Sequence, residues 1–292
     1  MVGNLFKAVF SGTLLSQLRK SLDSSEKRGK GLRIRLRLNN APALAALPWE
    51  FLYDEEQDHF LTTSELTPLV RYPELSQIVS PLRVSLPLRV LVVIALPRNL
   101  NHLRAEEERE KLKRSLSRMK TAGRRRAARG EPFHILHFIG HGGFDKVVED
   151  GVLHFEDATG MSDPIQGYLL GNTLRDHTSL RLAVLNACEG ARQSVEDPFS
   201  GVAQSLCRQR LPSCVAMQFE ISDDAALTFA EEFYTAIADG LPVEAAVSSA
   251  RRARFTNAAS TTSILRPNLV ITGTSTSLPR SSSNVGKARF AG

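Results

Sequence analysis

The chain has 292 residues, of which 42% are hydrophobic and 23% are charged, proportions typical of globular proteins. These numbers exclude wholesale disorder, collagen and a coiled coil, and they allow one large α/β domain or two smaller domains. The formal net charge is +6, which can indicate a nucleic-acid partner. However, residues 251–292 hold seven Lys and Arg and no Asp or Glu, so the rest of the chain is almost neutral. We therefore expect no nucleic-acid partner.

Neither a membrane span nor a secretory signal is expected. No apolar run approaches the ~18 residues that a membrane span needs, and polar residues such as Lys7 and Ser11 interrupt the N-terminal stretch. The three cysteines are odd in number and have no CxxC spacing, which disfavours a disulfide framework or a zinc ribbon. A reducing compartment fits this cysteine usage, so we expect a cytoplasmic protein with no membrane partner.

The N-terminal region, residues 1–85, predicts a small α+β part. Apolar residues within 3–23 are spaced on one face of a helix, and the charged stretch 24–31 is expected to be a loop. Residues 32–39, LRIRLRLN, alternate strictly between apolar residues and arginines, which predicts a strand with one solvated face. An anionic partner for the arginine row is the alternative interpretation. The motif PWEFLYD (48–54) follows and contains the single Trp.

The middle of the chain alternates apolar strands with helices. Continuous apolar runs are typical of strands covered on both faces of a parallel sheet. Such runs occupy 86–96, 133–140, 180–187 and 213–219. Helices are expected at about 103–120, 199–209, 221–240 and 242–254, and weaker elements at 152–157 (strand) and 165–177 (helix). This alternation predicts a doubly wound, mostly parallel sheet flanked by helices. The Ser/Thr-rich tail, 255–292, is expected to be loosely ordered, with a possible short strand at 269–272.

His141 and Cys188 each end one of these predicted strands, 47 positions apart. In open parallel sheets, ligands bind at the carboxyl ends of the strands, and in caspases the histidine precedes the cysteine by about 50 residues. An imidazole can deprotonate a thiol and later protonate the leaving amine. Gly142 and Gly143 directly follow the histidine, so a backbone N–H in this expected turn, together with that of Cys188, is a candidate oxyanion donor.

Plainer interpretations of the cysteines and histidines remain open. A cysteine after a buried strand is usually an inert apolar residue, and Cys207 and Cys214 fit that description better than Cys188. His134 and His137 lie within a buried strand and are expected to be hydrogen-bonded core residues. His137 shares a strand face with His141 and can support it. Alternation turns His134 away from the other two, so we expect no metal site.

Four motifs together resemble a CHAT domain, a caspase-like family that is similar to separase and often accompanies tetratricopeptide repeats in bacteria. They are HFIGHGGFD (137–145), LNACEGA (185–191), PWEFLYD (48–54) and the helical stretch 221–253. The resemblance implies an α/β, three-layer caspase–haemoglobinase-like fold, with a mostly parallel sheet flanked by helices and an N-terminal α+β extension. It divides the chain into the N-terminal part of the CHAT region (1–85), the peptidase core (86–254) and the basic tail (255–292).

The resemblance also implies a cysteine endopeptidase with a His–Cys dyad. His141 would be the general base and acid, Cys188 the nucleophile and Gly142 a part of the oxyanion hole. Asn186 and Glu189 would lie near the primary specificity pocket. The substrate would be a protein or peptide, cleaved in a bacterial signalling or defence context without a cofactor. Any regulatory or tetratricopeptide-repeat partner would be a separate chain.

Three departures from the family keep a second hypothesis open. The family has a further strand and helix where this chain has only 121–132, and it has a Pro where this chain has Glu220. The family also ends with a strand near a Trp after the last helix, whereas the tail of this chain has no Trp and no clear strand pattern. These differences favour a catalytically impaired CHAT-like interaction or scaffold module, a pseudo-peptidase that retains the motifs.

Overall fold

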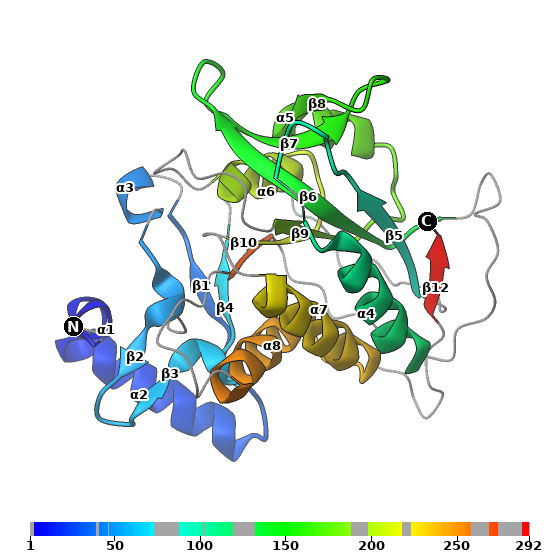
Figure 1. Cartoon of the computed structure of the whole chain (residues 1–292). Coiled ribbons are helices and arrows are strands. Elements are labelled where there is room, and N and C mark those ends of the chain that lie inside the picture. Colours follow the sequence, from blue (N-terminus) through cyan, green and yellow to red (C-terminus); the bar gives the residue numbers. More distant parts are fainter. Residues whose placement is uncertain are drawn as a thin grey trace.

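Among the residues that the structure describes, ten strands form one sheet at the centre of the fold, and most of these strands are parallel (Figure 1). The computed structural model describes residues 3–38, 41–45, 47–72, 88–101, 103–118, 132–187, 198–217, 223–257, 269–273 and 288–291. Eight strands follow one another across the sheet in the order β1 (Ile34–Leu36), β4 (Leu69–Arg71), β11 (Leu269–Gly273), β10 (Ser213–Met217), β9 (Leu182–Ala187), β6 (Ile135–Asp145), β5 (Leu88–Ile94) and β12 (Ala288–Ala291). Neighbours in this order are parallel except β10 and β11. The predicted α/β class with a mostly parallel sheet is confirmed.

Helices cover both faces of this sheet, as the continuous apolar strands predicted. One face packs against α4 (Ala105–Arg118), α7 (Asp223–Ala238) and α8 (Val243–Asn257), and the other against α5 (Gly167–Leu174) and α6 (Pro198–Arg208). In β6, Ile135 and Ile139 belong to the first core, and Leu136 and Phe138 belong to the second. Because successive side chains alternate between the faces, a strand of this kind needs apolar residues at every position.

The strand that carries His141 is longer than predicted. β6 continues through the two glycines to Asp145 and pairs there with the antiparallel β7 (Asp150–Glu156), which in turn pairs with β8 (Ser162–Gln166). The expectation of a turn at Gly142 and Gly143 was therefore wrong. Glycine has a low strand propensity, and here the ladder to β7 holds the backbone extended.

The predicted weak helix 165–177 is β8 followed by α5, and its glycines have a packing role. A Cβ at Gly167 would stand only 2.9 Å from the backbone Cα of Val202 on α6. A Cβ at Gly171 would stand 2.8 Å from Cγ of Gln209. The glycines thus allow α5 and α6 to approach each other closely, which outweighs their low helix propensity.

The N-terminal region adds its strands β1 and β4 to the same sheet, and its helices lie beside them (Figure 1). The single helix expected at 3–23 is two helices, α1 (Asn4–Val9) and α2 (Gly12–Lys27). Gly12 has a φ of +52°, a conformation that glycine adopts readily, and it begins the second helix. The shorter elements are α3 (Pro42–Ala45), η1 (Trp49–Phe51), β2 (Tyr53–Asp54), β3 (His59–Phe60) and η2 (Leu61–Thr63).

The PWEFLYD motif fastens this region through buried polar contacts. Glu50 accepts hydrogen bonds from Nη2 of Arg71 at 3.1 Å and from its Nε at 3.3 Å. Trp49 donates its indole N–H to the carbonyl of Leu44 at 2.7 Å. Asp54, fully buried, forms an ion pair with Arg19 of α2. The motif therefore has a structural role, because each polar group that it buries has a partner.

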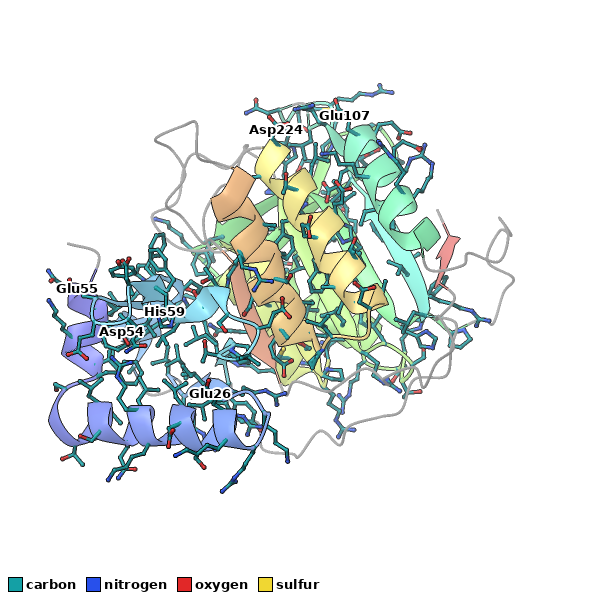
Figure 2. The ribbon with its side chains drawn as sticks, turned by 90° about the horizontal axis from the view of Figure 1, so that it is seen from below. Glu26, Asp54, Glu55, His59, Glu107 and Asp224 are labelled. Carbon is teal, nitrogen blue, oxygen red and sulfur yellow. The ribbon has the colours of Figure 1, made fainter. Side chains whose placement is uncertain are left out.

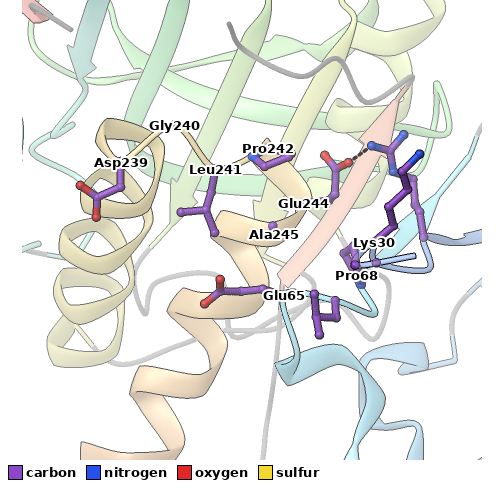
Figure 3. A pocket seen from close by; sticks show the side chains of 13 residues that line it. Lys30, Glu65, Pro68, Asp239, Gly240, Leu241, Pro242, Glu244 and Ala245 are labelled. Carbon is purple, nitrogen blue, oxygen red and sulfur yellow. Dashed lines mark hydrogen bonds and ion pairs between the residues drawn. The ribbon is translucent and has the colours of Figure 1, made fainter. Parts of the chain in front are cut away.

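The arginine row of β1 is only in part a solvated face. Arg35 and Arg37 are exposed and lie over the ring of Tyr72, with Cζ 5.1 and 5.6 Å from its centroid. Arg33 instead forms an ion pair with the buried Glu244 of α8 (Figure 3). A cavity of about 640 Å³ opens here, between the loops beside β1 and β4 and the turn from α7 to α8.

Of the two strands from the C-terminal tail, the sequence predicted one and not the other. β11 occupies the optional strand at 269–272, whereas β12, paired with the outer edge of β5, was not predicted. β5 and β6 are parallel neighbours in the sheet, and α4 lies between them in sequence. The short connection that follows α4 therefore leaves no gap between these two strands. Most of 121–132, and Glu220, lie outside the described residues.

In the part of the chain that the structure describes, no helix is both long and apolar enough to cross a membrane.

Candidate functional site

The carboxyl ends of β5, β6 and β9 meet at one edge of the sheet, where α4 and α7 begin. Arg104 joins the two helices there, donating to Asp224 at 2.8 Å and to Glu107 at 2.9 Å. Figure 2 shows Glu107 and Asp224 side by side at the first turns of α4 and α7. This edge is where ligands bind in open α/β sheets, and it contains the predicted site residue His141.

The register of β6 against β9 pairs the two residues that directly precede the predicted catalytic positions in sequence. Gly140 pairs with Ala187, the last residue of β9, and His141 follows Gly140. Cys188 and Glu189, the residues that follow Ala187 in sequence, lie outside the described residues. Gly140 and Ala187 thus form the pair in the ladder that directly precedes both candidate positions in sequence.

His141 is buried, with an exposed fraction of 3%, and its tautomer follows from its hydrogen bond. Nε2 lies 2.9 Å from the backbone carbonyl oxygen of Asn101. A carbonyl only accepts, so Nε2 carries the proton and Nδ1 holds the free lone pair of the neutral ring. Burial lowers the pKa of His141, and the hydrogen bond to Asn101 opposes that shift. The imidazole is thus neutral near pH 7 and able to take a proton at Nδ1.

The loop that supplies the Asn101 carbonyl is tied to the β7–β8 hairpin. The backbone N–H of Ser162 donates to Oδ1 of Asn99 at 2.9 Å, and that of Leu96 donates to Glu156 at 2.7 Å. These bonds hold residues 95–101 against the hairpin that pairs with the His141 strand. The loop that carries the acceptor for His141 is therefore hydrogen-bonded to both strands of this hairpin.

A buried polar cluster lies directly below this edge. Asn186 has an exposed fraction of 1%, and its Nδ2 donates to Oε1 of Glu108 on α4. The same carboxylate oxygen lies 3.1 Å from Nε2 of His137, and Nδ1 of His137 lies 2.9 Å from the hydroxyl of Tyr234 on α7. The side chain of Asn186 is thus directed into the interior toward α4, and its buried Oδ1 has no hydrogen-bond partner among the residues that the structure describes.

One assignment of protons satisfies the donors of this cluster. In this assignment the Tyr234 O–H donates to Nδ1 of His137, whose Nε2–H donates to Oε1 of Glu108. Burial, and secondarily the charge of Glu108, raise the pKa of Tyr234, so its hydroxyl keeps its proton. The expectation that His137 is a hydrogen-bonded core residue is confirmed. Its link to Asn186 and Glu108 also places it below the candidate site.

Three residues of this region were missed by the sequence analysis: Glu108, Tyr234 and His154. His154 of β7 is half-buried and lies directly opposite His141 in the β6–β7 ladder. Gly142, the predicted oxyanion-hole residue, lies opposite the fully buried Leu153. Residues that lie opposite each other in an antiparallel pair share a face of the sheet. The strand predicted at 152–157 follows the His141 strand closely in sequence, and its pairing with that strand was the signal that could have identified His154.

The remaining cysteines and histidines of the core are structural. Burial raises the pKa of Cys207 to about 12, and it also raises that of Cys214, so both remain thiols. His134 accepts a hydrogen bond from the backbone N–H of Arg89 at 3.0 Å. Burial, together with the positive charges of Arg89 and Arg181, lowers the pKa of His134. Among the described residues, no group of three or more His, Cys, Asp or Glu is arranged to hold a metal ion.

The fold and this edge define an α/β protein whose buried histidine lies beside the strand end that leads to a cysteine. A profile of the CHAT domain matches residues 2–267, and the chain therefore belongs to the CHAT domain family. That family is related to caspase-like cysteine peptidases, as the sequence motifs indicated. A search among curated proteins finds no significant match.

Proposed function

We propose that the chain is a caspase-like cysteine endopeptidase that cleaves proteins or peptides with a His141–Cys188 dyad. The observation that carries this proposal is the pairing of Gly140 with Ala187, because one further residue on each strand gives the histidine and the cysteine. The membership in the CHAT family supports it. We further propose that the sheet and its flanking helices form the three-layer caspase–haemoglobinase fold.

In the proposed reaction, Nδ1 of His141 takes the proton of the Cys188 thiol. The thiolate then attacks the carbonyl carbon of the scissile peptide, and backbone N–H groups of Gly142 and Cys188 stabilise the oxyanion. His141 next gives its proton to the leaving amine, which releases the first product and leaves a thioester. Water, deprotonated by His141, hydrolyses the thioester. The Asn101 carbonyl supports these steps, since it holds the ring in the required tautomer and also accepts from the imidazolium.

The proposed specificity pocket lies next to the same strand end. Asn186 and Glu189 flank the Ala187–Cys188 segment in sequence. The side chain of Asn186 is buried against Glu108, so it would support the pocket from below without contacting the substrate. A substrate side chain bound here would lie beside the proposed nucleophile. A regulatory partner, such as a separate tetratricopeptide-repeat protein, is part of this proposal.

A peptide library tests the dyad directly. The wild-type chain should cleave a subset of peptides, and both Cys188→Ala and His141→Ala should abolish cleavage. Cys207→Ala is the matched control, because it removes a buried thiol remote from the proposed site and should keep the activity. Cleavage that survives Cys188→Ala would contradict the assignment.

The second candidate function is a pseudo-peptidase scaffold that retains the motifs. The observation in its favour is the short connection between α4 and β6, where the family has a further strand and helix. A thiol-reactive peptide probe separates the two functions. Labelling at Cys188 that His141→Ala abolishes would support the peptidase, whereas unchanged labelling in that variant would support the scaffold.

A further inference from the structure

We infer that Asn99 is a positioning residue of the proposed dyad, because its side chain anchors the loop whose carbonyl binds His141. This inference takes its catalytic meaning from the proposed function, whereas the anchoring is a property of the fold and can be tested without activity. The loop joins the end of β5 to the start of α4, and its Asn101 carbonyl oxygen lies 2.9 Å from Nε2 of His141. The orientation of the imidazole therefore depends on where this loop lies.

Two bonds from backbone N–H groups hold the first half of the loop. The N–H of Leu96 donates to the carboxylate of Glu156 on β7 at 2.7 Å. The N–H of Arg98 donates to the carbonyl of Gly160, in the turn between β7 and β8, at 2.9 Å. Neither bond involves a side chain of the loop itself. Both act on residues well before Asn101, so they do not by themselves fix the position of its carbonyl group.

The side chain of Asn99 holds the second half of the loop. Its Oδ1 accepts from the backbone N–H of Ser162 on β8 at 2.9 Å. Among residues 95–101, its side chain is the one that bonds to the described hairpin. Asn99 also lies inside a turn that the N–H of Leu100 closes with the carbonyl of Pro97 at 3.1 Å. Only Leu100 separates Asn99 from Asn101, so a shift of this anchor moves the acceptor carbonyl as well.

The hairpin holds its side of this contact independently of the loop. Oδ1 of Asp157 accepts from the backbone N–H groups of Thr159 at 2.8 Å and Met161 at 2.9 Å, which fixes the turn between the two strands. The next residue, Ser162, begins β8 and belongs to its ladder with β7. The N–H that binds Asn99 thus has a defined place, and Asn99 brings the loop to it.

The exposure of Asn99 allows its positioning role to be separated from a role in folding. Alanine at this position would remove the acceptor without opening a cavity, because the side chain lies at the surface. The Ser162 N–H would then bind water instead of the loop. Aspartate would keep an oxygen that accepts from the same N–H. A change at His141 in Asn99→Ala that Asn99→Asp reverses therefore reports the position of the loop.

NMR of the imidazole N–H groups in the isotope-labelled, full-length protein tests this anchoring. The Nε2–H resonance of His141 is the one that is absent in His141→Gln, and its bond to the Asn101 carbonyl should protect it from exchange with water. In Asn99→Ala the exchange should be roughly three- to tenfold faster, the factor that the loss of one hydrogen bond adds to local opening. Asn99→Asp should restore the wild-type rate.

Arg98→Ala is the matched control for this measurement. It removes the adjacent exposed side chain and keeps the backbone bond to Gly160, so it should leave the exchange of His141 unchanged. An activity readout extends the test. Because a displaced base lowers the rate of the chemical step, kcat should fall severalfold in Asn99→Ala, KM should change less, and Asn99→Asp should recover kcat.

The inference is overturned if His141 exchanges equally fast in the wild type and in Asn99→Ala, or if Arg98→Ala accelerates the exchange as much. Should Asn99→Ala not fold, the wild type decides. A Ser162 amide that exchanges like a free amide while the His141 ring stays protected would overturn the inference, and protection of both would support it. A wild-type chain without cleavage would refute the proposed function, and the exchange measurement would still decide the anchoring.

Discussion

Replacement of Glu108 by Ala should be among the most destabilising single changes on the helical layer. The carboxylate has an exposed fraction of 1%, and one of its oxygens accepts from both His137 and Asn186. The alanine would leave two buried donors without an acceptor, at about 1–3 kcal/mol each. The two together cost roughly 4 kcal/mol, the middle of that range. This is a large share of the unfolding free energy of folded domains, which is typically about 5–15 kcal/mol.

Urea denaturation followed by far-UV circular dichroism measures this loss. With a slope of roughly 2–3 kcal/mol/M, the midpoint should fall by roughly 1–2 M in Glu108→Ala. Glu107→Ala is the matched control, since its side chain lies on the same helix but is 54% exposed, and it should leave the midpoint nearly unchanged. Glu108→Gln should fall between them, because an amide oxygen still accepts but carries no full charge. Equal midpoints for Glu108→Ala and Glu107→Ala would refute the assigned role of the cluster.

Two other predictions concern the strand that carries the candidate base and the buried or half-buried histidines on and beside it. Gly143→Ala would place a methyl group 3.1 Å from both Nε2 of His154 and Cγ2 of Val152, so it should cost about 1–3 kcal/mol and shift the His154 resonances, as denaturation and NMR would report. The second is a loss of stability below pH 6.5. Burial is the main cause that lowers the pKa of His134, His141 and His154 in the folded state. The unfolded chain therefore binds protons first, near its ordinary pKa of about 6.5. Their contribution is complete above that pH and is lost as the pH falls toward the folded values, at up to about 1.4 kcal/mol per pH unit for each histidine. Urea midpoints that are constant between pH 7 and pH 5 would contradict it.

The core strands could be predicted from sequence because each is covered on both faces. The apolar runs at 86–96, 133–140, 180–187 and 213–219 correspond to β5, β6, β9 and β10. The extension of β6 beyond Gly140 could not be predicted, since glycines carry no strand signal and the extension depends on β7. β12 escaped prediction for the same reason, because its pairing with β5 joins segments that are remote in sequence.

A site residue could be predicted where its position in the sequence places it in the fold. It could not be predicted where its role depends on a partner that is distant in sequence. His141 follows an apolar run, so its place at the carboxyl edge could be inferred. Glu108 stands in a run of three glutamates that looks solvated, yet Ala105, Glu108 and Leu112 form one buried stripe of α4 at helical spacing. That spacing was the available signal. The partner of Glu108 on β9 could be identified only from the fold.

The polar cluster under the site bears on the register of the two strands that lead to the proposed dyad. In the β6–β9 ladder, Asn186 lies opposite Ile139, and His137 lies opposite Val184. Glu108 therefore binds side chains that are diagonal neighbours on one face of the sheet. Apolar contacts tolerate a slip of two residues, because it returns every side chain to the same face. A single carboxylate oxygen that binds both His137 and Asn186 does not tolerate it, so the cluster selects the register that brings His141 beside the end of β9.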